Sequence, residues 1–147
     1  MVFHYGKRGK GVKQYNYYRI ALNDFKYLEY NIQIEDEDIY NRNGILCEQV
    51  VEKLLKHIVE RACFKEDYSN LLKGHNLVKL YKAILEEGIE LDLSINMLRT
   101  LKDYYFDANY PGDNFILLTK EEVDEAYAFT KDTLAKVKKV IEDKGIE

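Results

Sequence analysis

The C-terminal part of the chain carries a hydrophobic repeat that suits a long helix. From Val123 to Ile141, the residues of this repeat are separated by steps of four, three, four, three and four. Such spacing places them on one face of an α-helix that packs lengthwise on others. Before the repeat, Thr119 and Glu122 have the spacing of a capping box, which satisfies free backbone N–H groups where a helix begins. We therefore predict a helix from just after Thr119 to about Lys144. The repeat consists of Val123, Tyr127, Thr130, Leu134, Val137 and Ile141.

Residues that interrupt helices are scarce in the rest of the chain. There are one Pro and 8 Gly in 147 residues, which favours long helices. Gly88 is placed as a left-handed C-cap, and Pro111 ends the helix before it. Because no run of residues alternates convincingly, we predict an all-α fold, an up-and-down bundle of four to five helices, and interpret residues 115–118 as an extended lead-in to the last helix. The four other predicted helices cover about residues 14–32, 43–63, 75–87 and 92–108.

Length and composition indicate one globular domain. A chain of 147 residues with 46% hydrophobic and 33% charged residues fits one domain with one core. We expect residues 1–13, with four basic residues among three glycines, to form a flexible basic tail, and residues 14–147 to form the bundle. The sequence shows neither a signal peptide nor a membrane span, so we expect a cytoplasmic protein with no membrane contact.

Charge and cysteine content limit which ligands and metal sites the sequence predicts. The net charge of -4 argues against indiscriminate binding of nucleic acid and leaves only a local basic patch for that role. Cys47 and Cys63 do not form a Cys-x-x-Cys pair, and we expect both to be reduced. His57 and Cys63 are six residues apart on a predicted helix, which is not a spacing that shares one face. We therefore predict no metal site and no cofactor.

Three segments of the sequence resemble the HEPN domain. They are Cys47–Lys56 on the second predicted helix, Gly74–Leu77 at the start of the third, and Asp103–Pro111 at the end of the fourth. The resemblance extends over about residues 15–141. It implies a small helical bundle of the kind found in prokaryotes, often beside a minimal nucleotidyltransferase. It further implies a homodimer and a nucleotide-binding or partner-binding module, working with a nucleotidyltransferase partner in a toxin–antitoxin-like system.

The sequence departs from the family pattern at two points. Relatives commonly read Tyr-x-x-x-Arg-Tyr-Pro where this chain has Asn109 before Tyr110, and an amide lacks the charged fork of arginine for phosphate. Many HEPN ribonucleases use an Arg followed by a His with four to six residues between them, and none of the five arginines here precedes a histidine at that spacing. The sequence therefore provides no catalytic residue and does not favour an enzyme. A ribonuclease with an atypical site remains as an alternative.

The resemblance gives a set of candidate nucleotide-binding residues. Lysines on the second helix would meet phosphate, and tyrosines near Pro111 would stack on the base. The alternatives are that the lysines are surface charges in pairs such as Glu52 with Lys56, and that His75 is a cap or packing residue. A further alternative concerns the whole chain, which would then be a purely structural dimerisation bundle. The candidates are Lys53, Lys56, His75, Asp103, Tyr104, Tyr105, Asn109 and Tyr110.

Overall fold

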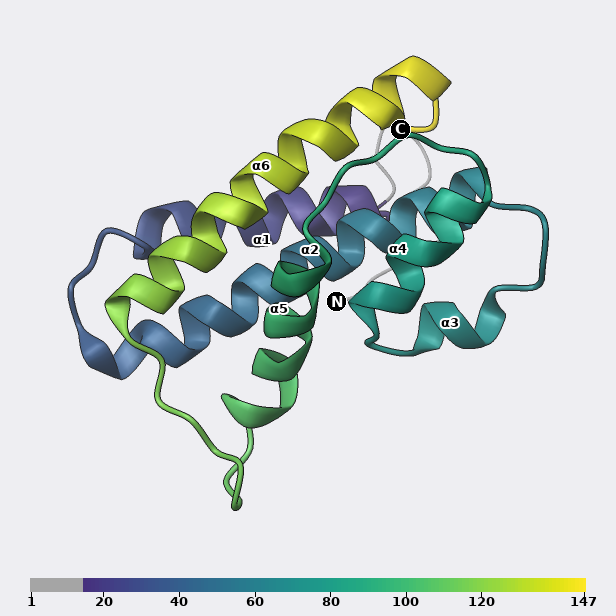
Figure 1. Ribbon diagram of the computed structural model, residues 1–147. Helices are drawn as coiled ribbons and strands as arrows, with labels where there is room; N and C mark the ends of the chain where they lie inside the picture. Colours follow the sequence, from purple (N-terminus) through teal and green to yellow (C-terminus); the bar gives the residue numbers. More distant parts are fainter. Residues whose placement is uncertain (1–14) are drawn as a thin grey trace, which may run out of the picture.

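The computed structural model describes residues 15–147, which form helices joined by short connections (Figure 1). No strand occurs in this part of the chain, so the all-α prediction is confirmed. Five helices correspond in order to the five predicted ones, and the short α3 is an addition that the sequence did not indicate. The predicted basic tail lies outside the described residues. The elements are α1 (Tyr17–Asn31), a 3-10 turn η2 (Glu37–Ile39), α2 (Tyr40–Ala62), α3 (Ser69–Lys73), α4 (Leu77–Glu86), α5 (Ile95–Asp107) and α6 (Lys120–Lys144).

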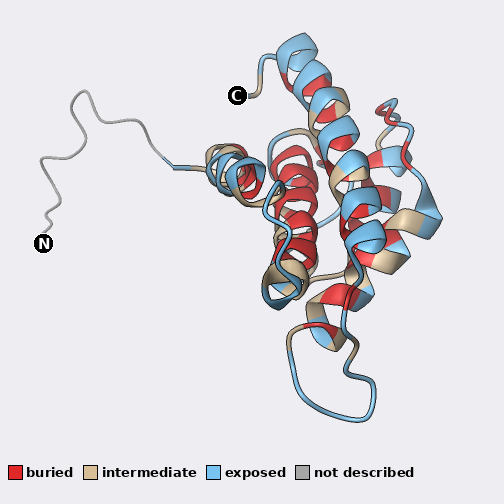
Figure 2. Ribbon diagram, turned by 90° about the vertical axis from the view of Figure 1, so that its left-hand side faces the viewer, coloured by how far each residue is buried: buried red, intermediate tan, exposed pale blue. Residues whose placement is uncertain are grey.

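The long helix α2 lies at the centre of the molecule. It packs against α1, α4, α5 and α6, and Figure 2 shows it as a buried helix enclosed by the others. Because neighbours surround it, its buried residues are not restricted to one stripe. Its buried apolar residues are Ile45, Cys47, Val50, Val51, Leu54, Leu55, Ile58 and Val59. Polar residues between them are therefore buried as well.

The helix α4 begins later than predicted and is capped by a different residue. The side chain of Asn76 accepts a hydrogen bond from the Lys79 N–H at 3.1 Å, as an N-cap residue does. His75 therefore precedes the cap, and the interpretation of His75 as the cap is wrong. At the other end, Gly88 has a φ of 84°, so the predicted left-handed C-cap is confirmed.

The predicted start of α6 is confirmed in detail. The Thr119 side chain accepts from the Glu122 N–H at 3.1 Å, and the Glu122 side chain accepts from the Thr119 N–H at 2.9 Å. The repeat is only partly buried, because Tyr127 and Leu134 are half exposed. An α-helix has 3.6 residues per turn, so a repeat of 3.5 drifts around it. Ala126, Thr133 and Val140 complete the buried face.

The connection between α5 and α6 is fastened to α2 by one side chain. Asn41 donates hydrogen bonds to the carbonyl oxygens of Ala108 and Ile116 at 3.1 and 2.9 Å, and accepts one from the Leu118 N–H at 2.8 Å. The segment 115–118 forms no strand, in agreement with its predicted role as a lead-in. Leu118 is buried against α2 at Gly44, where a larger residue would overlap its side chain.

None of the helices described between residues 15 and 147 combines the length and the apolar character needed to cross a membrane.

Candidate functional site

Three charged residues of α2 are buried in a row. Glu48, Glu52 and Lys56 follow one another at intervals of four residues and therefore lie on one face of the helix. Only 0, 3 and 5% of their surfaces are exposed, respectively. Charged side chains are seldom buried so completely unless they are paired, because removing a charge from water is costly. This face of α2 therefore requires specific partners.

The partners come from α2 itself, from the turn before α4 and from α5. Glu52 Oε2 lies 3.0 Å from Lys56 Nζ, and Glu52 Oε1 lies 2.9 Å from His75 Nδ1. The other ring nitrogen of His75, Nε2, lies 3.2 Å from the hydroxyl oxygen of Tyr105. The His75 and Tyr105 rings are stacked, with centroids 4.2 Å apart and planes at 19°. We call Glu48, Glu52, Lys56, His75 and Tyr105 the His75 cluster.

The His75 cluster has a buried end and an exposed end. The side chain of Glu52 is 4% exposed, whereas that of His75 is 37% exposed. Lys56 Nζ lies 6.0 Å from the centre of the Tyr17 ring, so an aromatic face from α1 covers the ammonium group. The imidazole of His75 therefore connects buried charges with the surface.

Glu48 is held in its protonated form at neutral pH. Burial raises the pKa of Glu48 to about 9, together with the negative charge of the nearby Glu52 carboxylate. Gln49 donates to Glu48 Oε1 at 2.8 Å, while Glu48 Oε2 has no partner at normal hydrogen-bond distance among residues 15–147. A neutral carboxyl group tolerates this environment, whereas an ionised one would leave a buried charge without compensation.

Glu52, in contrast, is held in its ionised form. Burial alone would raise the pKa of Glu52, but the neighbouring carboxyl group of Glu48, the hydrogen bonds from His75 and Lys56, and the charge of Lys56 together lower it. An ionised carboxylate only accepts hydrogen bonds, so Nδ1 of His75 must carry the proton in its bond to Glu52. This fixes the ring orientation and turns Nε2 toward Tyr105 and the surface. The site can thus present an oriented imidazole to a ligand.

A comparison with protein families identifies the chain. The HEPN domain matches residues 15–140. The chain belongs to the HEPN domain family. Searches of curated proteins and of solved structures found no match to this chain.

The structure of this HEPN domain brings some of the predicted site residues together. Lys56, His75 and Tyr105 belong to the His75 cluster, and Tyr110 lies near enough to Tyr105 to contribute, after burial, to the raised pKa of its hydroxyl. Lys53 lies at the edge, with Nζ 2.7 Å from Gln49 Oε1 and 3.6 Å from Asp24 Oδ2. The predicted pair of Glu52 with Lys56 exists, but it is a buried pair and not the surface pair that the alternative assumed.

The other predicted residues lie elsewhere. Tyr104 is buried in the core beside Gly44, where burial raises the pKa of its hydroxyl to about 12. Adjacent residues on a helix point in different directions, so Tyr104 cannot share the exposed face of Tyr105, and its placement in a tyrosine groove is corrected. Asp103 is exposed and Asn109 is half exposed, and neither side chain forms a hydrogen bond within the described part of the domain.

The sequence analysis missed Glu48 and Glu52 as the centre of the site. These two acids are four residues apart, within residues 45–59, a run that is otherwise rich in Val, Leu and Ile. That pattern indicates buried carboxylates. On a helix with one solvent-facing side, the acids would lie on that side, away from the apolar residues. Within residues 15–147, no group of three or more His, Cys, Asp or Glu residues is arranged to hold a metal ion.

The protonation state of Glu48 predicts a specific dependence of stability on pH. The folded domain keeps the Glu48 proton up to about pH 9, whereas the unfolded chain releases it near the ordinary value of 4.5. The folded domain therefore binds one proton more than the unfolded chain between these values, and the free energy of unfolding decreases as pH rises from 4.5 to 9. Gln does not ionise, so the Glu48→Gln variant lacks this decrease. We expect its free energy of unfolding, relative to that of the wild type, to increase between pH 5 and pH 8 by on the order of 1 to 3 kcal/mol.

Urea unfolding of both proteins at several pH values measures this difference. Glu66→Gln is the matched control, because Glu66 is exposed, and we expect no such increase for it. A difference between Glu48→Gln and wild type that stays constant from pH 5 to pH 8 would show that Glu48 is ionised in the folded domain.

Proposed function

We propose that this HEPN domain is a nucleotide-binding module whose ligand contacts His75 and Tyr105. The observation that carries the proposal is the partly exposed imidazole, which the buried carboxylate of Glu52 orients and the Tyr105 ring supports. A site of this kind is preorganised, so little conformational freedom is lost when a ligand binds.

The proposed contacts follow from the chemistry of each group. When protonated, His75 donates one N–H to Glu52 and has a second N–H at Nε2 for a phosphate oxygen. The exposed ring of Tyr110 and the half-buried ring of Tyr105 provide surfaces on which a base can stack. Lys53 is the more accessible of the two lysines, since Lys56 is buried against Glu52. Lys53 is therefore the lysine that we assign to phosphate.

The partners expected from the sequence also belong to this proposal. We propose a minimal nucleotidyltransferase as protein partner, in a toxin–antitoxin-like system in the cytoplasm, and a homodimer as the working form. Exposed apolar side chains near the end of α5 and in the connection to α6 support a protein contact there, because large apolar groups favour interfaces. These side chains are Phe106, Tyr110, Phe115 and Leu117.

Nucleotide binding should raise the melting temperature of the domain. Because Asn109 replaces the family's arginine, we expect weak binding, with dissociation constants in the high micromolar to millimolar range. At a ligand concentration of about 100 times the dissociation constant, the stabilisation should reach roughly 2.7 kcal/mol. Thermal melts with ATP, GTP and AMP measure it. His75→Ala should abolish the shift and Lys53→Ala should reduce it, whereas Asn109→Arg should increase it by supplying a fork for phosphate.

Lys79→Ala is the matched control for Lys53→Ala, because Lys79 is an exposed lysine near the start of α4. Its melting shift should equal that of the wild type. If no nucleotide moves the melting temperature and Asn109→Arg changes nothing, the purely structural dimerisation bundle is the better account.

The atypical ribonuclease is the second candidate, and one observation favours it. An imidazole held by a carboxylate, as His75 is held by Glu52 at 2.9 Å, is a general acid or base of the kind that can act on a 2′-hydroxyl of RNA. The missing arginine weighs against it, because among residues 15–147 no guanidinium group is bonded to the His75 cluster, where it could stabilise the charge that develops on the phosphate.

We therefore expect no cleavage of RNA above background. Structured and unstructured RNA, incubated with purified protein in the presence of a metal chelator, is the assay. Cleavage by the wild type that disappears in both His75→Ala and Glu52→Gln would contradict this prediction and assign the His75 cluster to catalysis.

A further inference from the structure

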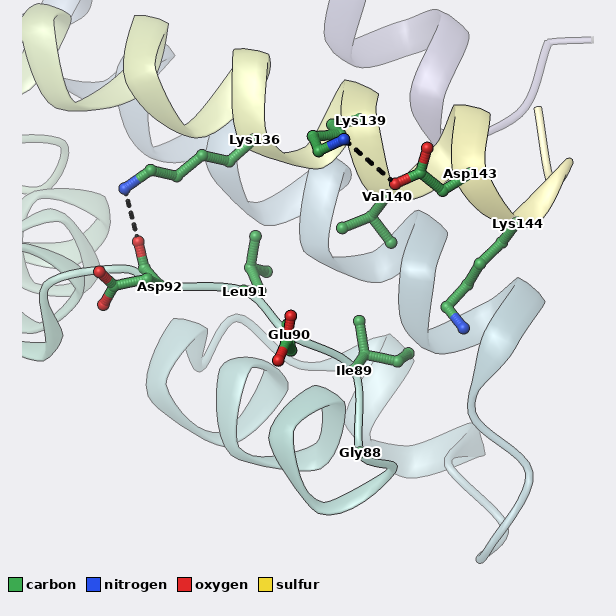
Figure 3. Close-up of a pocket in the computed structure, with 10 residues that line it drawn as sticks. All are labelled: Gly88, Ile89, Glu90, Leu91, Asp92, Lys136, Lys139, Val140, Asp143 and Lys144. Carbon is green, nitrogen blue, oxygen red and sulfur yellow. Dashed lines mark hydrogen bonds and ion pairs between the residues drawn. The ribbon is translucent and has the colours of Figure 1, made fainter.

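A concave surface lies apart from the His75 cluster. A groove of about 820 Å³ runs between the segment Gly88–Asp92 and the C-terminal half of α6, and none of its lining residues belongs to the cluster. Figure 3 shows Ile89 and Leu91 beneath Val140 of α6, with charged side chains around them. The groove therefore has an apolar floor and a polar rim, as binding sites commonly do.

One wall of the groove is built like a β-strand. From Ile89 to Ser94, buried and exposed residues alternate without exception, the period of an extended chain with one face on a core. The Tyr81 hydroxyl group donates to the Leu91 carbonyl oxygen at 2.7 Å and accepts from the Leu93 N–H at 3.0 Å. One edge of this extended segment is thus bonded to α4.

The opposite edge is only partly occupied. The Asp92 carbonyl oxygen accepts from Lys136 Nζ at 2.7 Å, so this edge faces α6. In an extended chain, the backbone polar groups of residues i and i+2 point to the same side, which places those of Glu90 on the side of α6 as well. Among residues 15–147, neither the N–H nor the C=O of Glu90 has a hydrogen-bond partner. Glu90 therefore offers one donor and one acceptor to an incoming chain.

The charge on α6 indicates what that chain carries. Three lysines of α6 line the groove together with three acids, Asp143 of the same helix and Glu90 and Asp92 of the extended segment. Lys136 forms an ion pair with Asp132 and donates a hydrogen bond to the Asp92 carbonyl group. Lys139 forms an ion pair with Asp143 at 3.4 Å. Lys144 forms no ion pair within the described residues, and Figure 3 shows it directed toward the Ile89 end of the groove. An acidic side chain at that end would complement it.

We propose that this groove binds an extended peptide segment of a partner protein, which pairs with the backbone of Glu90 as an added β-strand and directs an acidic side chain to Lys144. Addition of a strand to a free edge is a common mode of peptide recognition, in which the main chain supplies affinity and the side chains supply specificity. The site is independent of the proposed nucleotide site, since the two share no residue.

A synthetic peptide tests the proposal directly. The probe is Thr-Val-Thr-Glu-Thr-Val-Thr with blocked ends, titrated into the isotope-labelled protein and followed by amide NMR shifts. We expect shifts confined to residues 88–92 and 136–144, with slower hydrogen exchange of the Glu90 amide in the complex. A peptide with Lys in place of Glu should bind more weakly, as should the Lys144→Gln protein. Lys138→Gln is the matched control, because Lys138 is an exposed lysine of α6 outside the groove, and it should bind as the wild type does.

A second probe isolates the backbone contact. The same peptide with its central amide nitrogens methylated cannot donate to Glu90, and we expect about 2- to 10-fold weaker binding for each hydrogen bond lost. The proposal is overturned if millimolar peptide shifts no groove amide, if the methylated and unmethylated peptides bind equally, or if Lys144→Gln leaves the preference for Glu over Lys unchanged. Because the readout is local and His75 is not involved, failure here leaves the nucleotide proposal standing.

Discussion

The enclosure of the middle of α2 by α1, α4, α5 and α6 is the constraint on which the rest of the structure depends. In the enclosed part of this helix, from Asn43 to Val59, most polar side chains have little access to water, and a buried one needs a partner inside the protein. Glu52 is held by Lys56 and His75, and Glu48 keeps a proton and receives a hydrogen bond from Gln49. The polar residues of α2 thereby determine which segments lie beside it.

His57 shows the same principle at the other end of the bundle. It is fully buried, accepts from the Tyr18 N–H at 3.4 Å, and lies 2.6 Å from the Ile146 carbonyl oxygen. Burial is the first cause of its lowered pKa, and the neutral ring can accept at Nδ1 while it donates at Nε2. One side chain of α2 thus fastens the start of α1 and the C-terminal segment. Of the two described histidines, only His75 remains accessible to a ligand.

The sequence was sufficient to predict most of the fold, because the fold depends on local signals. The capping box at Thr119, the glycine at position 88 and the helical periodicity each act within a few residues. The site was harder to predict, because it depends on contacts between residues distant in sequence. Glu52 and His75 are 23 residues apart and His75 and Tyr105 are 30 apart, and no periodicity indicates which of several tyrosines meets the imidazole. Tyr104 and Tyr105 are the same residue type in opposite environments, since Tyr104 is buried beside Gly44 and Tyr105 stacks on His75.

The central claim is that an ionised, buried Glu52 holds the imidazole of His75 by its Nδ1 proton. A long-range nitrogen–proton NMR spectrum of the neutral imidazole groups tests it most directly, because it shows which ring nitrogen carries the proton. The account predicts that the neutral His75 ring carries its proton on Nδ1 and leaves Nε2 bare, and that Glu52→Gln weakens this preference. A His75 ring that is neutral with its proton on Nε2 and a bare Nδ1 would contradict it, because an ionised carboxylate cannot donate to that nitrogen.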